Sequence, residues 1–225
     1  MNENILYEYV GNDIKIIIPN YIQKIGAAAF FENNNIKSVI IPNTVIEIGV
    51  DCFCRCINLE SVNIPESVEV IHGDAFCGCY NLKNIHLPRN ITSLGQKTFL
   101  NCISLESVII PNAVVEICEQ VFCNCRSLEK IDIPQNVKKI GLFAFEKCIS
   151  MKTVSFHTGL KEILPFAFYV CKNLENITLP DSIESVSEYA FYECDNLKTV
   201  SIPETLNDIG KDAFGNAKII VRKTV

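Results

Sequence analysis

Hydrophobic and polar positions along the chain repeat with a period of 23 residues. Phe recurs at this spacing, and Pro marks the same interval except at His157. Counting each unit from its Pro as position 0, residues 19–225 divide into nine units without an insertion. Position 11 is Phe in every unit, at Phe30, Phe53, Phe76, Phe99, Phe122, Phe145, Phe168, Phe191 and Phe214.

Each unit carries two local periodicities. Positions 20 and 22 are apolar and positions 19 and 21 are mostly polar, which predicts one short strand. Positions 7, 10, 11 and 14 have the i, i+3, i+4, i+7 spacing of a short helical turn whose apolar side faces inward. Positions 3 and 6 form a further apolar strip.

A single 23-residue unit cannot bury its own apolar side, whereas stacked units can. We therefore predict a repeat solenoid in which each strand pairs in parallel with the next and the Phe side chains form a continuous core. The unit is mostly β, with one parallel strand and one short helical turn.

The pattern C-x-x-L-x-x-V-x-I-P-x-x-V-x-x-I-G-x-x-A-F resembles the BspA-like, or treponemal-type, leucine-rich repeat family. The resemblance covers residues 19–225. It implies a leucine-rich repeat horseshoe, and it implies a binding or adhesion module and not an enzyme.

The N-terminal segment differs from the repeats. Residues 5–18 contain two alternating apolar runs around Gly-Asn-Asp, a pattern typical of a hairpin. We expect residues 1–18 to form an N-terminal β-hairpin cap, with Tyr7 and Tyr9 covering the first unit. Residues 19–225 would then form a single solenoid domain.

Seven of the twelve cysteines occupy position 14, which predicts a row of buried, reduced thiols. Three C-x-C pairs (Cys54 with Cys56, Cys77 with Cys79, Cys123 with Cys125) leave open a metal- or redox-responsive protein as an alternative function. Position 12 faces outward and position 14 inward, so one ion would not reach both. We expect no metal site and no cofactor.

Composition and charge exclude several classes of protein. The net charge of −6 argues against nucleic-acid binding, and no apolar run is long enough for membrane insertion. The three histidines have no triad partners, and no Gly-rich phosphate loop occurs, so no enzyme is expected. The absence of a basic start and the reduced cysteines suggest a cytoplasmic protein, or a cell-surface protein if the chain is a processed fragment.

Two outward surfaces are candidates for binding. The turn face, at positions 8, 9, 12 and 13, has an aromatic patch that could also mediate self-association: Leu142, Phe143, Phe166, Tyr169, Tyr189 and Tyr192. The sheet face, at positions 19 and 21, is polar and includes Asn63, Asn84, His86, Lys130, Asp132, Thr153, Asn176 and Thr178. We expect a non-catalytic protein-interaction or adhesion scaffold. Its expected partner is a protein, and a glycan is the alternative ligand.

Overall fold

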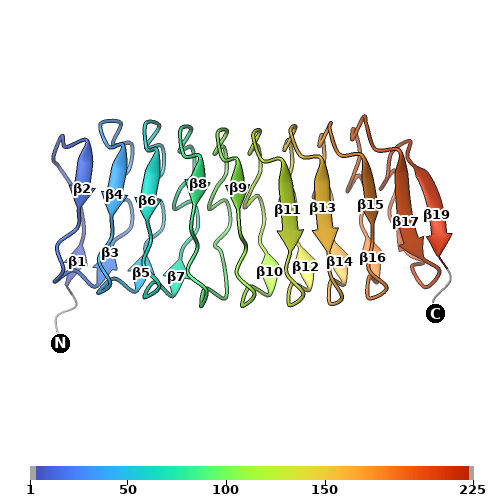
Figure 1. Ribbon diagram of the computed structural model, residues 1–225, viewed down its shortest axis with the longest axis horizontal. Coiled ribbons are helices and arrows are strands. Elements are labelled where there is room, and N and C mark those ends of the chain that lie inside the picture. The colour runs from blue at the N-terminus through green and yellow to red at the C-terminus, as the bar shows by residue number, and fades with distance from the viewer. Residues whose placement is uncertain (1–3, 223–225) are drawn as a thin grey trace.

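The computed structural model describes residues 4–222, which stack as successive coils in a single row. The two ends of the chain lie at opposite ends of the row (Figure 1). Each complete coil contributes to two parallel ladders, although the coil that contains Phe99 joins the second ladder only through an isolated bridge from Leu94 to Ile71, and residues 4–222 contain no helix. The predicted repeat solenoid and its parallel strand are confirmed, but most units have a second short strand as well, and the predicted helical turn is absent from residues 4–222.

The first ladder forms the sheet face and contains the predicted strand of each unit. Its strands pair in parallel, and Lys130 faces Thr153, the equivalent residue 23 positions later. The strands are β2 (Lys15–Ile17), β4 (Ser38–Ile40), β6 (Ser61–Asn63), β8 (Asn84–Ile85), β9 (Ser107–Val108), β11 (Lys130–Ile133), β13 (Thr153–Phe156), β15 (Asn176–Thr178), β17 (Thr199–Pro203) and β19 (Lys218–Arg222).

The second ladder lies at positions 5 and 6 of each unit. Sequence analysis described positions 3 and 6 only as an apolar strip and predicted no strand there. Its strands are two residues long, too short for an alternating pattern to distinguish them from loop. They are β1 (Ile5–Leu6), β3 (Lys24–Ile25), β5 (Glu47–Ile48), β7 (Val70–Ile71), β10 (Glu116–Ile117), β12 (Lys139–Ile140), β14 (Glu162–Ile163), β16 (Ser185–Val186) and β18 (Asp208–Ile209).

Consecutive β-turns replace the expected helical turn. In the coil that contains Phe53, the amides of Asp51, Phe53 and Arg55 donate to carbonyl oxygens of the next coil at 3.2, 2.8 and 2.7 Å. Asp51 and Arg55 have φ values of 55° and 59°, as in the third residue of a type II turn. The inward spacing was correctly identified, but these amides bond between coils and therefore cannot bond along a helix.

The core is a stack of the nine repeated Phe rings. Adjacent centroids are 4.9–5.8 Å apart and the rings are tilted by 3–22° from one another. Each position-14 thiol donates to the carbonyl oxygen of the Phe in the preceding coil, for example Cys102 Sγ to Phe76 O at 3.2 Å. Cysteine suits this row because it is small, apolar and still able to donate.

The N-terminal segment forms a first, incomplete coil in place of the expected hairpin. β1 pairs in parallel with β3 and β2 pairs in parallel with β4, so the two strands lie in different sheets. Tyr9 packs on the first core ring, Phe30, with centroids 5.4 Å apart, whereas Tyr7 is 73 % exposed. Residues 1–3 of the predicted cap lie outside the described residues.

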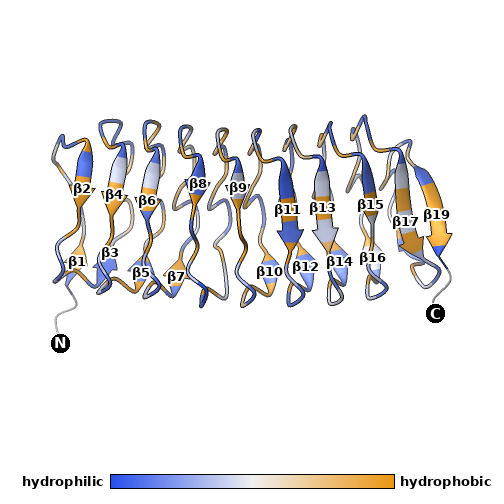
Figure 2. Ribbon diagram, viewed as in Figure 1, coloured by the Kyte–Doolittle hydropathy of each residue, from blue (hydrophilic) through white to orange (hydrophobic). Residues whose placement is uncertain are grey.

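The last coil, like the first, is four residues shorter than the 23-residue coils between them. Lys218 pairs with Thr199, 19 residues earlier, where the other sheet-face strands pair at 23. The turn after Phe214 leads directly into β19, because the unit lacks the C-x-x-L segment. β19 itself is mostly hydrophobic between its charged ends (Figure 2). Sequence analysis missed this deletion, since Phe214 itself remains in phase.

We expect Val170→Asn to stabilise the protein. Val170 is β-branched and has a φ of 61°, a region that costs an L-residue about 1–2 kcal/mol but that Asn adopts readily. The equivalent position in two other coils is already Asn, at Asn101 and Asn124. The free energy of unfolding should rise by about 1 kcal/mol, or about 2–4 °C in Tm. Thermal denaturation followed by circular dichroism measures it, with Val115→Asn as the exposed control; equal Tm changes in the two variants would contradict this explanation.

Candidate functional site

The turn-face patch forms as a set of stacked rings. Phe166 stacks on Phe143 and on Tyr189, with centroids 5.0 and 5.2 Å apart, and Tyr169 lies over Tyr192 at 6.3 Å. The rings pack against one another, which leaves them only partly exposed. Tyr192 is 37 % exposed and the other five residues are half-buried. This geometry favours a stabilising role, and binding through this patch stays a prediction.

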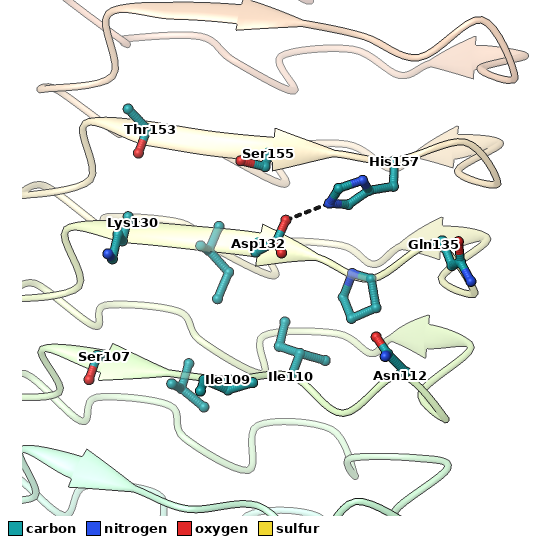
Figure 3. Close-up of a pocket in the computed structure, with 13 residues that line it drawn as sticks. Ser107, Ile109, Ile110, Asn112, Lys130, Asp132, Gln135, Thr153, Ser155 and His157 are labelled. Atoms are coloured by element: carbon teal, nitrogen blue, oxygen red, sulfur yellow. Dashed lines mark hydrogen bonds and ion pairs between the residues drawn. The ribbon is translucent and has the colours of Figure 1, made fainter.

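A hollow with a volume of about 1000 Å³ lies on the sheet face and spans three consecutive coils. We call it the sheet-face groove; it is lined by residues 107–110, Asn112, residues 130–132, Pro134, Gln135, Thr153, Ser155 and His157. Figure 3 shows these residues on adjacent strands and on the turns that follow them, with Lys130 toward one end and His157 and Gln135 toward the other.

The groove brings together three of the predicted sheet-face residues: Lys130, Asp132 and Thr153. The remaining five are exposed on the same face but lie outside the groove: Asn63, Asn84, His86, Asn176 and Thr178. Some of these bond to the neighbouring coil; the hydroxyl of Thr199, for example, donates to Asn176 Oδ1 at 2.6 Å. Asn63 lines a second, smaller hollow of about 400 Å³ on the same face, together with Lys15 and Ile40.

The groove forms where strand pairing on the sheet face is interrupted. β9 ends at Val108, and β9 and β11 belong to different sheets. Ile109 follows β9 and is 83 % exposed. Sequence analysis did not identify this site, although an isoleucine between the polar residues His86 and Asp132 of the same row was a usable signal.

Two of the three charged or titratable side chains of the groove pair with each other, and the third, Lys130, does not pair with them. His157 Nε2 lies 2.7 Å from Asp132 Oδ1, and Lys130 forms no ion pair within residues 4–222. The Asp132 and His157 side chains are 74 % and 49 % exposed, unlike the buried Asp–His pair that orients a catalytic nucleophile. The arrangement suits contact with a partner better than proton transfer.

The structure corrects the expected exposure of the C-x-C cysteines. Cys54 and Cys123 are 6 % and 5 % exposed, because side chains of the next coil cover them. Cys123 Sγ, for instance, lies 3.4 Å from Glu146 Oε2. No group of three or more His, Cys, Asp or Glu residues within 4–222 is placed to hold a metal ion. The metal-responsive alternative therefore has no supporting cluster in the described part of the chain.

The thiols should be unreactive in the folded protein. Burial raises the pKa of the Cys56 and Cys123 thiols to about 12, which disfavours the reactive thiolate. Ten of the twelve cysteines are buried, and only Cys77 and Cys118 are half-exposed.

A colorimetric disulfide reagent should titrate two thiols quickly in native buffer and the other ten only after denaturation. Fast reaction of more than two thiols would contradict this structure, and the Cys77→Ser/Cys118→Ser double variant is the control.

Known proteins resemble this chain over nearly its whole length. The family model described as "BspA type Leucine rich repeat region" matches residues 3–129 and 115–223. A leucine-rich repeat protein from Bacteroides ovatus is 27 % identical with a TM-score of 0.63, covering 97 % of this chain and 73 % of that one. A leucine rich cell surface protein from Faecalibacterium prausnitzii is 25 % identical with a TM-score of 0.64, covering 97 % and 72 %.

More distant comparisons add less. The pneumococcal vaccine antigen PcpA shares the fold, at 20 % identity and a TM-score of 0.52, covering 94 % of this chain and 69 % of that one. No curated protein matches the sequence. Within residues 4–222, no helix is long and apolar enough to cross a bilayer.

Proposed function

The chain belongs to the BspA-type leucine-rich repeat family, and from this premise we propose that it is a non-catalytic scaffold that binds another protein through its sheet face. Proteins with this fold are typically interaction or surface scaffolds and are generally not enzymes. The observation that carries the proposal is the sheet-face groove, a concave surface with an exposed isoleucine, an unpaired lysine and several hydroxyl and amide groups. Large concave surfaces with few, well-placed polar groups are typical of binding sites.

Site-specific photo-crosslinking tests this function. A benzophenone amino acid would replace Thr153 in the groove, Tyr192 on the turn face or the exposed Val115 just before β10, each in the full chain. We expect discrete protein adducts from position 153 in extracts and surface fractions of the source cell, and none from position 115. Adducts from position 192 alone would move the interface to the turn face. No adduct from any position would contradict a protein-binding scaffold.

Adhesion at a cell surface is the specific form of this function that the Faecalibacterium prausnitzii relative favours, since it is described as a cell surface protein. The elongated shape, with the ends of the chain far apart, suits display of a broad surface (Figure 1). Biotinylation of intact cells with a membrane-impermeant reagent tests this location. Labelling only after lysis would favour the intracellular form of the same scaffold.

A further inference from the structure

The sheet face differs in charge from the rest of the molecule. Its outward rows carry Lys15, Lys130 and Lys218 but only one acidic residue, Asp132, although the chain as a whole has a net charge of −6. The outward positions of the turn face carry eight carboxylates and four cations. The turn face would therefore repel an acidic segment of a partner, whereas the less negative sheet face would not.

Lys130 is the cation within the groove that remains available to a ligand. It lies on β11, is exposed, and has no ion pair within the described chain, whereas other lysines in the same part of the chain are engaged. Lys139, for example, lies 3.3 Å from Glu116. The nearby acidic group, Asp132, is directed toward His157 on the next coil, on the side away from Ile109 (Figure 3).

Ile109 supplies an apolar contact beside this cation. It occupies position 21 of its coil, so it lies one coil from Asp132 and diagonal to Lys130, with neighbouring coils about 4.8 Å apart. Its side chain is 83 % exposed, although the other lining residues at positions 19 and 21 of the groove are polar. An aliphatic side chain and a carboxylate on adjacent residues of one ligand could reach Ile109 and Lys130 together.

We propose that the sheet-face groove binds a peptide segment of a partner protein in which an aliphatic residue adjoins an acidic residue. The aliphatic side chain packs on Ile109 and the carboxylate pairs with Lys130, while the Asn112 and Gln135 amides are available to the peptide backbone. A glycan fits less well, because no Phe, Tyr or Trp ring is present among the groove residues for sugar rings to pack against. A nucleic acid would need several cations, and the groove has one lysine and a histidine already paired with Asp132.

Fluorescence anisotropy with defined peptides tests this inference, which rests on the proposed function. The probes are labelled peptides with one Gly/Ser frame and repeated central pairs of Leu-Glu, Leu-Gln, Leu-Lys or Ser-Glu. We expect the full chain to bind the Leu-Glu peptide most tightly. Lys130→Gln should weaken that peptide about 2- to 5-fold and remove its advantage over Leu-Gln. Ile109→Ser should weaken it about 10-fold.

Matched variants separate the groove from general effects of charge and hydrophobicity. Lys138→Gln makes the same change of charge just before β12, and Val115→Ser removes an exposed aliphatic side chain just before β10; both variants should bind the Leu-Glu peptide as the wild type does. Equal binding of Leu-Glu and Leu-Gln, or a preference that survives Lys130→Gln, would overturn the inference. So would binding of a sulfated oligosaccharide more tightly than the peptide. If no peptide binds but position 153 still crosslinks a partner, the protein-binding function is supported and the recognition of an aliphatic–acidic peptide in the groove is excluded.

Discussion

Replacing Phe122 by Ala should lower the free energy of unfolding by about 3–5 kcal/mol. The Phe122 ring is fully buried in the middle of the stack, with its centroid 5.5 Å from that of Phe99 and 5.4 Å from that of Phe145. Its removal leaves a cavity that the flanking rings cannot fill, because each is fixed by its own coil. In a solenoid, whose coils contact only their neighbours, a weakened middle coil also reduces the coupling between the two halves.

Urea denaturation followed by circular dichroism measures this effect, and Phe31→Ala is the matched control. Phe31 adjoins the core ring Phe30 in sequence but is 44 % exposed, so its loss should cost under about 1 kcal/mol. A broadened or two-step transition in Phe122→Ala would be consistent with reduced coupling. A midpoint equal to that of Phe31→Ala would contradict the central role of the ring stack.

Gly95→Ala should be the second strongly destabilising change, by about 3 kcal/mol. A Cβ at Gly95 would lie 2.2 Å from the amide nitrogen of Gly73 and 2.5 Å from the carbonyl carbon of His72. Both atoms belong to the backbone of the preceding coil and cannot rotate away, so the two coils would have to separate. The glycine is needed here for close approach of backbones and not for a positive φ.

Gly73→Ala separates this steric effect from the loss of a glycine as such. A Cβ at Gly73 would have the Gln96 carbonyl oxygen as its nearest neighbour, at 3.1 Å, so a small adjustment accommodates it. We expect Gly73→Ala to change the free energy of unfolding by less than about 1 kcal/mol in the same urea measurement. Equal losses in the two alanine variants would show that the spacing between these coils is more adaptable than the structure indicates.

The Phe residues and the polar alternation were sufficient to predict the stacking, the buried ring column and the sheet-face strands. The turn segment was misassigned because residues such as Cys52, Phe53 and Cys56 face inward with helical spacing in either structure. A helical turn and consecutive β-turns differ in the carbonyl oxygens to which the backbone amides donate. The pattern of inward and outward side chains does not show this difference. The second ladder was missed because pairs such as Glu47–Ile48 are too short to show a period.

The candidate site was predictable in part. The orientation of Lys130, Asp132 and Thr153 followed from the period of two along a strand. Their meeting in a groove did not, because the period of two does not show where pairing between neighbouring strands is interrupted, as it is between β9 and β11. An apolar residue between polar neighbours of one row, such as Ile109, is therefore informative in a repeat sequence.

The separation of the two ends by the whole row of coils has a mechanical consequence. Tension applied through the termini acts along the stack, so an end coil can be peeled off while the others remain folded. Each released coil of 23 residues would add about 80 Å of extended chain. Under load the protein should therefore lengthen in regular steps, as an extensible tether that yields gradually and can rewind from the coils still in place.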